Sequence, residues 1–158
     1  MIGKVAVMGL LGRHGTKGSQ VRLKVVKGVK RRDLMPHIEQ HVERGANVYT
    51  DSLPSYGILN DDYIHGVIDH AETYVNGQIH TNGCENFWSL LKRALKGTYV
   101  SVEPFHLFRY LDEQAFRFNN RIEMNDADRF SLAITGIVGR RLTYKELIGA
   151  LGAVTSPN

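Results

Sequence analysis

Residues 46–59 read ANVYTDSLPSYGIL, and this stretch decides the fold class. Its first six residues predict a short strand that ends on the carboxylate of Asp51. Asp-Ser-Leu-Pro then begins a turn, and residues 53–59 predict a short helix. Strands that alternate with helices are typical of α/β folds, and open α/β sheets place ligands at the carboxyl ends of their strands. Asp51 is therefore either an ordinary turn residue or one ligand of a site.

Outward from this stretch, strand patterns and helical patterns continue to alternate. The other expected strands are 5–11, 21–25 and 66–68. The expected helices are 30–43, 83–96, Pro104 to about Asn120, and a short last one between Leu142 and Leu147. This order predicts a single α/β domain with a mixed sheet flanked by helices.

Length and composition are those of one globular domain with a hydrophobic core. The chain has 158 residues, of which 42% are hydrophobic and 23% are charged. No apolar run approaches the roughly 20 residues needed to cross a bilayer, and the first residues lack the features of a signal peptide. The single cysteine, Cys84, excludes an internal disulfide and fits a reducing compartment. We therefore expect a cytoplasmic protein that does not associate with membranes.

The net charge of +4 is distributed unevenly along the chain. Residues 1–32 carry nine Lys or Arg and no acid, whereas residues 45–91 carry six acids and no Lys or Arg. Residues 92–158 carry ten basic and seven acidic residues. Such a pattern is either chance among solvated loops or a cation site within a polyanion-binding surface. The second arrangement is the one that metal-dependent enzymes acting on nucleic acids need, because the metal must meet phosphate.

Residues 80–99, HTNGCENFWSLLKRALKGTY, contain a second acid of interest. Asn82 and Glu85 fit a capping box, with Asn82 at the N-cap and Glu85 three residues later, which would stabilise the helix by about 1 kcal/mol. The expected core stripe of this helix is Cys84, Trp88, Leu91 and Leu95. Another stripe contains Glu85, Ser89, Lys92 and Lys96. A carboxylate followed by lysines also suits a surface that holds a metal ion and a phosphate.

Two other metal sites are conceivable from residue types alone. His65, His70, His80 and Cys84 could bind zinc, although their spacings match no common zinc pattern. Alternatively, the chain could be an unrelated small metal-dependent nuclease in which another acid completes a site with Asp51 and Glu85. The candidates for that acid are Asp61, Asp62 and Asp69.

Four blocks in this order carry a family resemblance. They are VYTDSLPSY (48–56), HTNGCENFWSLLKRALKGTY (80–99), YLDEQAFRFNNR (110–121) and RRLTYKEL (140–147). Together they resemble the DDE-type insertion-sequence transposases of bacteria and archaea, in the branch whose full-length members carry an N-terminal zinc ribbon. The resemblance extends over nearly the whole chain. It implies a ribonuclease-H-like fold and cut-and-join chemistry on DNA at a site with two Mg²⁺ or Mn²⁺ ions.

The resemblance also implies roles for individual residues. The family's second aspartate falls on Asp51 and its glutamate on Glu85, as catalytic and metal-binding residues separated by 33 others. His80 and Asn82 match the same block and are expected to shape the site. The residues expected to contact DNA are Lys92, Arg93, Lys96 and Arg121. The last of these follows Asn119 and Asn120, to which the resemblance assigns no role.

The sequence departs from the family at its start. The family's first aspartate lies on the strand before the one predicted at 5–11, yet no Asp or Glu occurs before Asp33, which belongs to the helix at 30–43. The resemblance thus implies that 1–158 is one partial catalytic domain that lacks the Asp-bearing strand and the zinc ribbon. Such a chain is expected to be inactive alone, or to be a non-catalytic DNA-binding or interaction remnant. Its expected partners are transposon ends, target DNA, and a second copy or a full-length transposase, in the nucleoid-associated cytoplasm.

Overall fold

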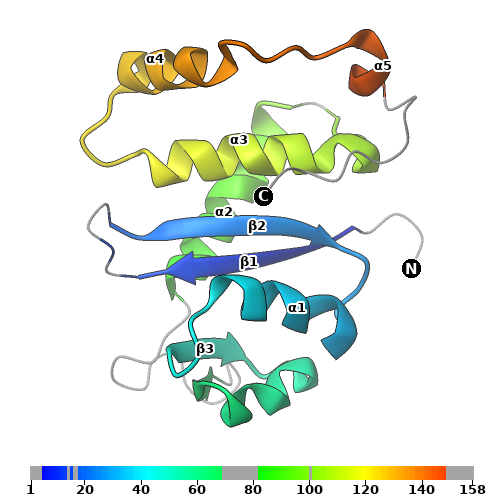
Figure 1. Ribbon diagram of the computed structural model, residues 1–158, viewed down its shortest axis with the longest axis vertical. Helices are drawn as coiled ribbons and strands as arrows, with labels where there is room; N and C mark the ends of the chain where they lie inside the picture. Colours follow the sequence, from blue (N-terminus) through cyan, green and yellow to red (C-terminus); the bar gives the residue numbers. More distant parts are fainter. Residues whose placement is uncertain (1–4, 14, 16–17, 69–81, 100, 149–158) are drawn as a thin grey trace.

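Strands and helices alternate along the chain, as the sequence predicts (Figure 1). The computed structural model describes residues 5–13, 15, 18–68, 82–99 and 101–148. The strands are β1 (Ala6–Gly12), β2 (Gln20–Val26), β3 (Asn47–Asp51) and β4 (Ile64–Ile68). The helices are α1 (Arg31–His41), α2 (Asn82–Gly97), α3 (Leu107–Asn119), α4 (Asp126–Ile137) and α5 (Tyr144–Leu147), with short 3-10 helices η1 (Pro54–Asp61) and η2 (Pro104–His106). Among the described helices, none has the length and apolar character needed to cross a membrane.

β1 and β2 form an antiparallel hairpin with helices on both faces. Successive side chains of a strand point to opposite faces, so Met8 joins the core around α1 while Val7 packs toward α2 and α3. Gly9 lies on the α2 face, where an added Cβ would be 2.7 Å from Cζ2 of Trp88. The absence of a side chain at this position therefore allows α2 to pack closely against β1.

β3 and β4 form a parallel pair, in register from Asn47 opposite Ile64 to Asp51 opposite Ile68. Parallel strands need a crossover of about a dozen residues or more, and the segment containing η1 provides it. Leu59 of this crossover is completely buried and packs with Leu34 and Ile38 of α1. The result is that Asp51 stands at the carboxyl end of a parallel strand pair.

The second core lies between the hairpin, α2 and α3. Phe87 of α2 is 2% exposed and its ring meets the Phe118 ring edge to face, with centroids 5.0 Å apart. At the end of α3, the Asn119 side chain forms two hydrogen bonds with the Val21 main chain. Its Oδ1 accepts from the N–H at 2.7 Å, and its Nδ2 donates to the carbonyl at 2.9 Å. Asn119 thereby occupies main-chain groups of β2 that would otherwise form an open strand edge.

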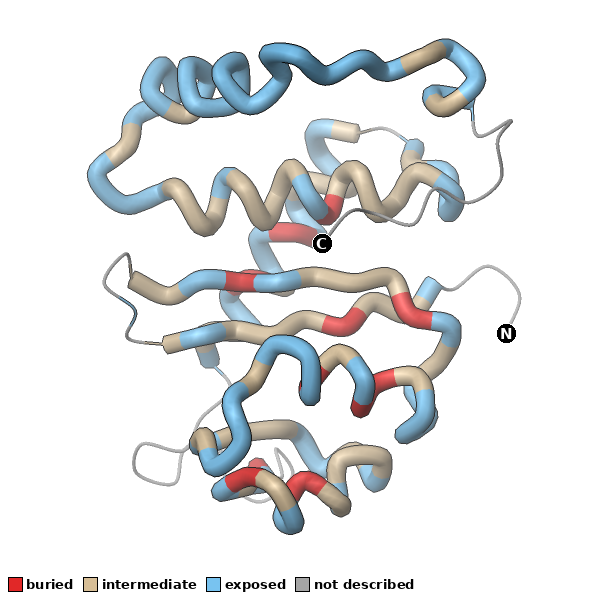
Figure 2. The backbone as a smooth tube through the Cα atoms, viewed as in Figure 1, coloured by how far each residue is buried: buried red, intermediate tan, exposed pale blue. Residues whose placement is uncertain are grey.

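The α/β class is confirmed, but the single mixed sheet is not. The described strands fall into two separate sheets, one antiparallel and one parallel, because no described strand bridges β1 and β3. The helix expected from Pro104 begins as η2 and continues as α3. The expected last helix is confirmed as α5, whereas α4 was not predicted. Figure 2 shows that α4 is exposed along nearly its whole length.

Candidate metal and DNA site

Asp51 is the last residue of β3 and is exposed. Its Oδ1 accepts a hydrogen bond from the Leu53 N–H at 3.3 Å, which is the local turn expected of Asp-Ser-Leu-Pro. An ionised carboxylate has about four acceptor positions, so this one contact leaves capacity for further ligands. The turn role and the ligand role of Asp51 are therefore compatible.

A hydrogen-bonded histidine joins β3 to β4 beside Asp51. The Nε2 atom of His65 lies 2.8 Å from Oγ1 of Thr50, and its Nδ1 lies 3.0 Å from Oδ1 of Asn60. Burial lowers the pKa of His65, which favours the neutral ring near neutral pH. Because both ring nitrogens already have partners, His65 is a structural residue here. His65 is therefore not free to bind zinc with Cys84. The other two residues of that candidate zinc site, His70 and His80, lie outside the described residues.

Glu85 lies in the first turn of α2 and is exposed. Tyr56 connects this region electrostatically with the end of β3. Burial raises the pKa of the Tyr56 phenol, and the nearby Asp51 carboxylate and Cys84 thiol raise it further. Cys84 at the start of α2 and Asp51 at the end of β3 therefore both lie near Tyr56.

Arg13 joins the same neighbourhood from the end of β1. Its guanidinium carbon lies 5.1 Å from the centroid of the Tyr49 ring on β3. Burial raises the pKa of the Cys84 thiol, Arg13 opposes that rise, and Glu85 adds to it. Arg13 therefore brings a positive charge into the space between β3 and the start of α2, where an anionic group would be favoured.

A cavity of about 690 Å³ adjoins these residues. It lies between β1 and β3, and its lining includes Leu11, Arg13, Asn47, Tyr49 and Cys84. In Figure 1 the two strands run in opposite directions, with β2 on the far side of β1. Among the described strands, β1 pairs with β2 alone and β3 with β4 alone, so the cavity separates two unpaired strand edges.

The donor set around Asp51 and Glu85 is small. In the part of the chain that the structure describes, no group of three or more His, Cys, Asp or Glu side chains is placed to hold a metal ion. Asp61 and Asp62 therefore do not complete a site with these acids, and Asp62 instead pairs with Arg44 at 3.7 Å. Asp69 lies outside the described residues. Two carboxylates still fit Mg²⁺, because this hard cation is commonly held by one or two carboxylates together with water and substrate phosphates.

The other predicted site residues have different surroundings. Asn82 is the first residue of α2, and the expected capping box with Glu85 stays a prediction. His80 lies outside the described residues. Lys92, Arg93 and Lys96 are exposed on α2, in the same helix as Glu85. Phe87 is a core residue that was not predicted, although it lies four residues before Leu91 on the same helix face.

Arg121 has a structural role that the sequence did not indicate. Its Nη1 donates to the carbonyls of Ser19, at 2.8 Å, and Phe118, at 2.6 Å, and the guanidinium lies 3.8 Å from the Phe118 ring centroid. It thereby ties the end of α3 to the β1–β2 turn. Asn120 donates from Nδ2 to the Phe116 carbonyl at 2.9 Å and stabilises the end of the same helix. A DNA contact of Arg121 stays a prediction.

Comparison with known proteins gives two matches. Residues 2–119 match the family described as the ISXO2-like transposase domain. A relative from Haemophilus influenzae, named "Uncharacterized transposase-like protein", is 34% identical over 97 residues, which cover 61% of this chain and 78% of that protein. No solved structure matches the chain. The family match ends at the last residue of α3, so α4 and α5 lie beyond it.

Proposed function

This chain belongs to the ISXO2-like transposase family, and from that premise we propose that it contributes the second aspartate and the glutamate of a DDE site that cuts and joins DNA. One observation carries the proposal. Asp51, at the carboxyl end of β3, and Cys84, which precedes Glu85 in the first turn of α2, both lie near Tyr56, which supports a common site for the two acids. The proposed substrates are the DNA of transposon ends and of the target.

In this proposal, Asp51 and Glu85 hold divalent metal ions, Mg²⁺ or Mn²⁺. When bound, a pair of such ions activates a water or a 3′-hydroxyl and stabilises the leaving oxygen of an in-line displacement. The hydrogen bonds of His65 with Thr50 and Asn60 hold the end of β3 in place. The exposed cations Lys92, Arg93 and Lys96 contact the phosphate backbone and position the DNA on α2.

We further propose that the two sheets are parts of one ribonuclease-H-like sheet. The facing edges of β1 and β3 would both be paired by an additional strand lying in the cavity between them. Neighbouring strands lie about 4.7–4.9 Å apart, so one inserted strand would join the antiparallel pair to the parallel pair. The family's first aspartate would stand on such a strand. No Asp or Glu precedes Asp33 in this sequence, so residues 1–32 do not supply that carboxylate.

The 158-residue polypeptide is therefore proposed to bind divalent metal weakly and to leave DNA intact. The test is a Mn²⁺ titration followed by electron paramagnetic resonance, on the unmodified chain and on Asp51→Asn and Glu85→Gln. Asp61→Asn is the matched control, because it removes an exposed acid from η1. We expect both site variants to bind Mn²⁺ at least tenfold more weakly and the control to bind normally. Unchanged Mn²⁺ binding in Asp51→Asn would overturn the proposed site.

A DNA-nicking assay on the same four proteins tests the inactivity separately. We expect no Mg²⁺-dependent or Mn²⁺-dependent nicking above background from any of them. Strong nicking that is lost in Asp51→Asn and Glu85→Gln would refute the inactivity and support the catalytic pair.

The alternative function is a non-catalytic DNA-binding or interaction module. The exposed basic residues of α2 favour it, since they need no metal to bind phosphate. This alternative predicts salt-dependent DNA binding by the unmodified chain without specific Mn²⁺ binding. It also predicts that Asp51→Asn and Glu85→Gln bind DNA as well as the unmodified chain does.

A further inference from the structure

Residues 122–148, here called the C-terminal arm, expose many apolar side chains. Every residue from Phe130 to Leu142 is exposed, and α4 and α5 contain no buried residue. Figure 2 shows the arm in the exposed colour along most of its length. The largest exposed fractions are those of Val138 (77%), Tyr144 (74%), Phe130 (67%) and Ile137 (60%). A monomer rarely exposes a contiguous apolar surface of this kind unless a partner covers it.

The apolar side chains of α4 follow the spacing of a helix-pairing seam. The stripe consists of Ala127, Phe130, Ile134 and Ile137, which follow one another in steps of three, four and three positions. All four are exposed. This spacing corresponds to the a and d positions of a heptad, which pack into the facing side chains of another helix. The geometry of the stripe therefore fits a second helix.

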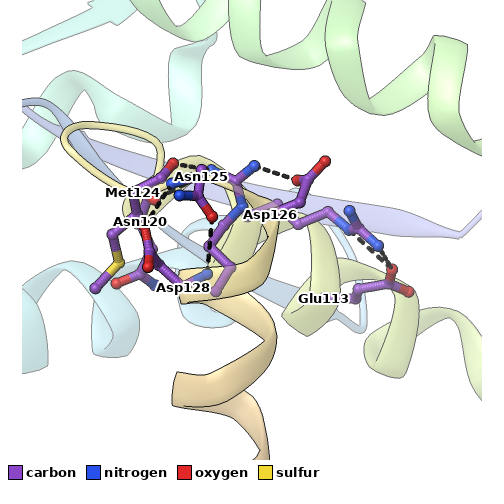
Figure 3. Close-up of polar contacts among 8 residues, drawn as sticks. Glu113, Asn120, Met124, Asn125, Asp126 and Asp128 are labelled. Carbon is purple, nitrogen blue, oxygen red and sulfur yellow. Dashed lines mark hydrogen bonds and ion pairs between the residues drawn. The ribbon is translucent and has the colours of Figure 1, made fainter.

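The start of α4 is well anchored, so the stripe is presented by a defined helix. The Asn125 side chain accepts from the Asp128 N–H, and the Asp128 carboxylate accepts from the Asn125 N–H, both at 3.0 Å (Figure 3). The Arg129 guanidinium donates to the Met124 carbonyl at 2.8 Å and pairs with the Asp126 carboxylate. These contacts fix the first turn while Phe130 and Ile134 remain exposed.

The charges at the two ends of α4 have opposite signs. Asp126 and Asp128 lie in its first turn, and Arg140 and Arg141 follow its end, all on the exposed surface. In an antiparallel pair of identical helices, the start of each helix lies beside the end of the other. Each acidic start would then meet a partner's basic end, and the two helix dipoles would oppose each other favourably.

We propose that α4 is a homodimer contact, in which the Phe130–Ile134–Ile137 stripe pairs antiparallel with the same stripe of a second copy. Such a contact is isologous, so one self-complementary surface is sufficient. The contact lies outside the family match and does not depend on Asp51 or Glu85.

The first test measures the mass of the full 158-residue chain in solution by sedimentation equilibrium. We expect a mass of about twice 17.8 kDa for the unmodified chain at tens of micromolar. Ile134→Glu should be monomeric, because it places a charge in the seam. Leu132→Glu is the matched control: Leu132 is 40% exposed and Ile134 43%, but Leu132 lies on the other side of the helix. Circular dichroism should report the same helical content for both variants.

A charge-exchange experiment tests the antiparallel orientation. Asp126→Arg alone and Arg140→Asp alone should each raise the dimer dissociation constant roughly tenfold, since each replaces an exposed attraction by a repulsion. Asp126→Arg also removes the pair with Arg129, so its helical content is checked by circular dichroism. The double variant should restore dimerisation, because each end again meets its opposite charge. A monomeric unmodified chain would overturn the proposal, as would equal effects of Leu132→Glu and Ile134→Glu. Dimerisation that the double variant fails to restore would overturn the antiparallel pairing.

Discussion

Replacing Asn119 by alanine is expected to lower the free energy of unfolding by about 2–3 kcal/mol. The side-chain amide forms two hydrogen bonds with the Val21 main chain, at 2.7 and 2.9 Å, and the Val21 residue is 3% exposed. A hydrogen bond contributes about 1 kcal/mol net, and a buried group left without a partner costs roughly 1–3 kcal/mol. The substitution leaves two main-chain groups of Val21 without a partner, for a total of about 2–6 kcal/mol, and since the bonds are partly buried we take the lower part of that total.

The measurement is urea unfolding followed by the fluorescence of Trp88, the single tryptophan of the chain. Trp88 packs against the second core, so its emission should report the loss of contact between the hairpin and the helices. Asn120→Ala is the control, because its one side-chain bond reaches only the Phe116 carbonyl within the same helix end. It should cost less than about 1 kcal/mol.

Equal losses of unfolding free energy in the two variants would refute the reasoning, since they would show that the bonds of Asn119 to β2 stabilise the chain no more than a bond within the end of α3. The unfolding slope should stay the same in all three proteins. A changed slope would mean that Asn119→Ala altered the denatured state or the two-state behaviour, and not simply the two bonds.

Further predictions concern packing, pH and DNA affinity. Gly9→Ala should destabilise the chain by about 1–3 kcal/mol, because its Cβ would meet Trp88 at 2.7 Å, and urea unfolding should show a smaller effect in a Trp88→Leu background. Because burial lowers the folded-state pKa of His65, the unfolded state binds more protons, so stability should fall as pH drops below about 6.5. In His65→Gln, the free energy of unfolding should change less with pH across this range, as measured by urea unfolding at several pH values. Lys92→Ala and Lys96→Ala should each weaken DNA binding by the same factor whatever the DNA sequence. Each should also reduce the slope of log affinity against log salt concentration by the amount of about one phosphate contact. Fluorescence anisotropy measures both effects.

Local patterns predicted most elements up to α3, because each depends on residues near it in sequence. The alternation at 21–25 and the apolar stripe of α2 recur as β2 and a buried helix face. Helix α4 was missed although its stripe has helical spacing. Its β-branched residues and Gly136 have low helix propensity, and the capping box of Asn125 and Asp128 outweighs them in the structure.

The candidate site shows the limit of local patterns more clearly. Asp51 at a strand end could be predicted from its own neighbours, and the structure places it there. The positive charge that Arg13 brings to this region could not be predicted, because it depends on β1 and β3 facing each other across a cavity. The structural use of Asn119 likewise depends on a bond between residues 98 positions apart. Long-range contacts of this kind carry no signal in a short stretch of sequence.

Two features of the structure allow the catalytic and the dimer proposals to fail independently. Both buried cores consist of residues up to Phe118, and neither includes a residue of the C-terminal arm. A charge introduced at Ile134 should therefore change the mass in solution while both cores stay folded, and any loss of stability should be only the contribution of dimerisation. Asp51 and Glu85 are themselves exposed, so Asp51→Asn and Glu85→Gln should change Mn²⁺ binding without changing the mass. If Ile134→Glu also abolished Mn²⁺ binding, the arm would have to contact the site, and α4 would belong to the catalytic body instead of to a separate interface.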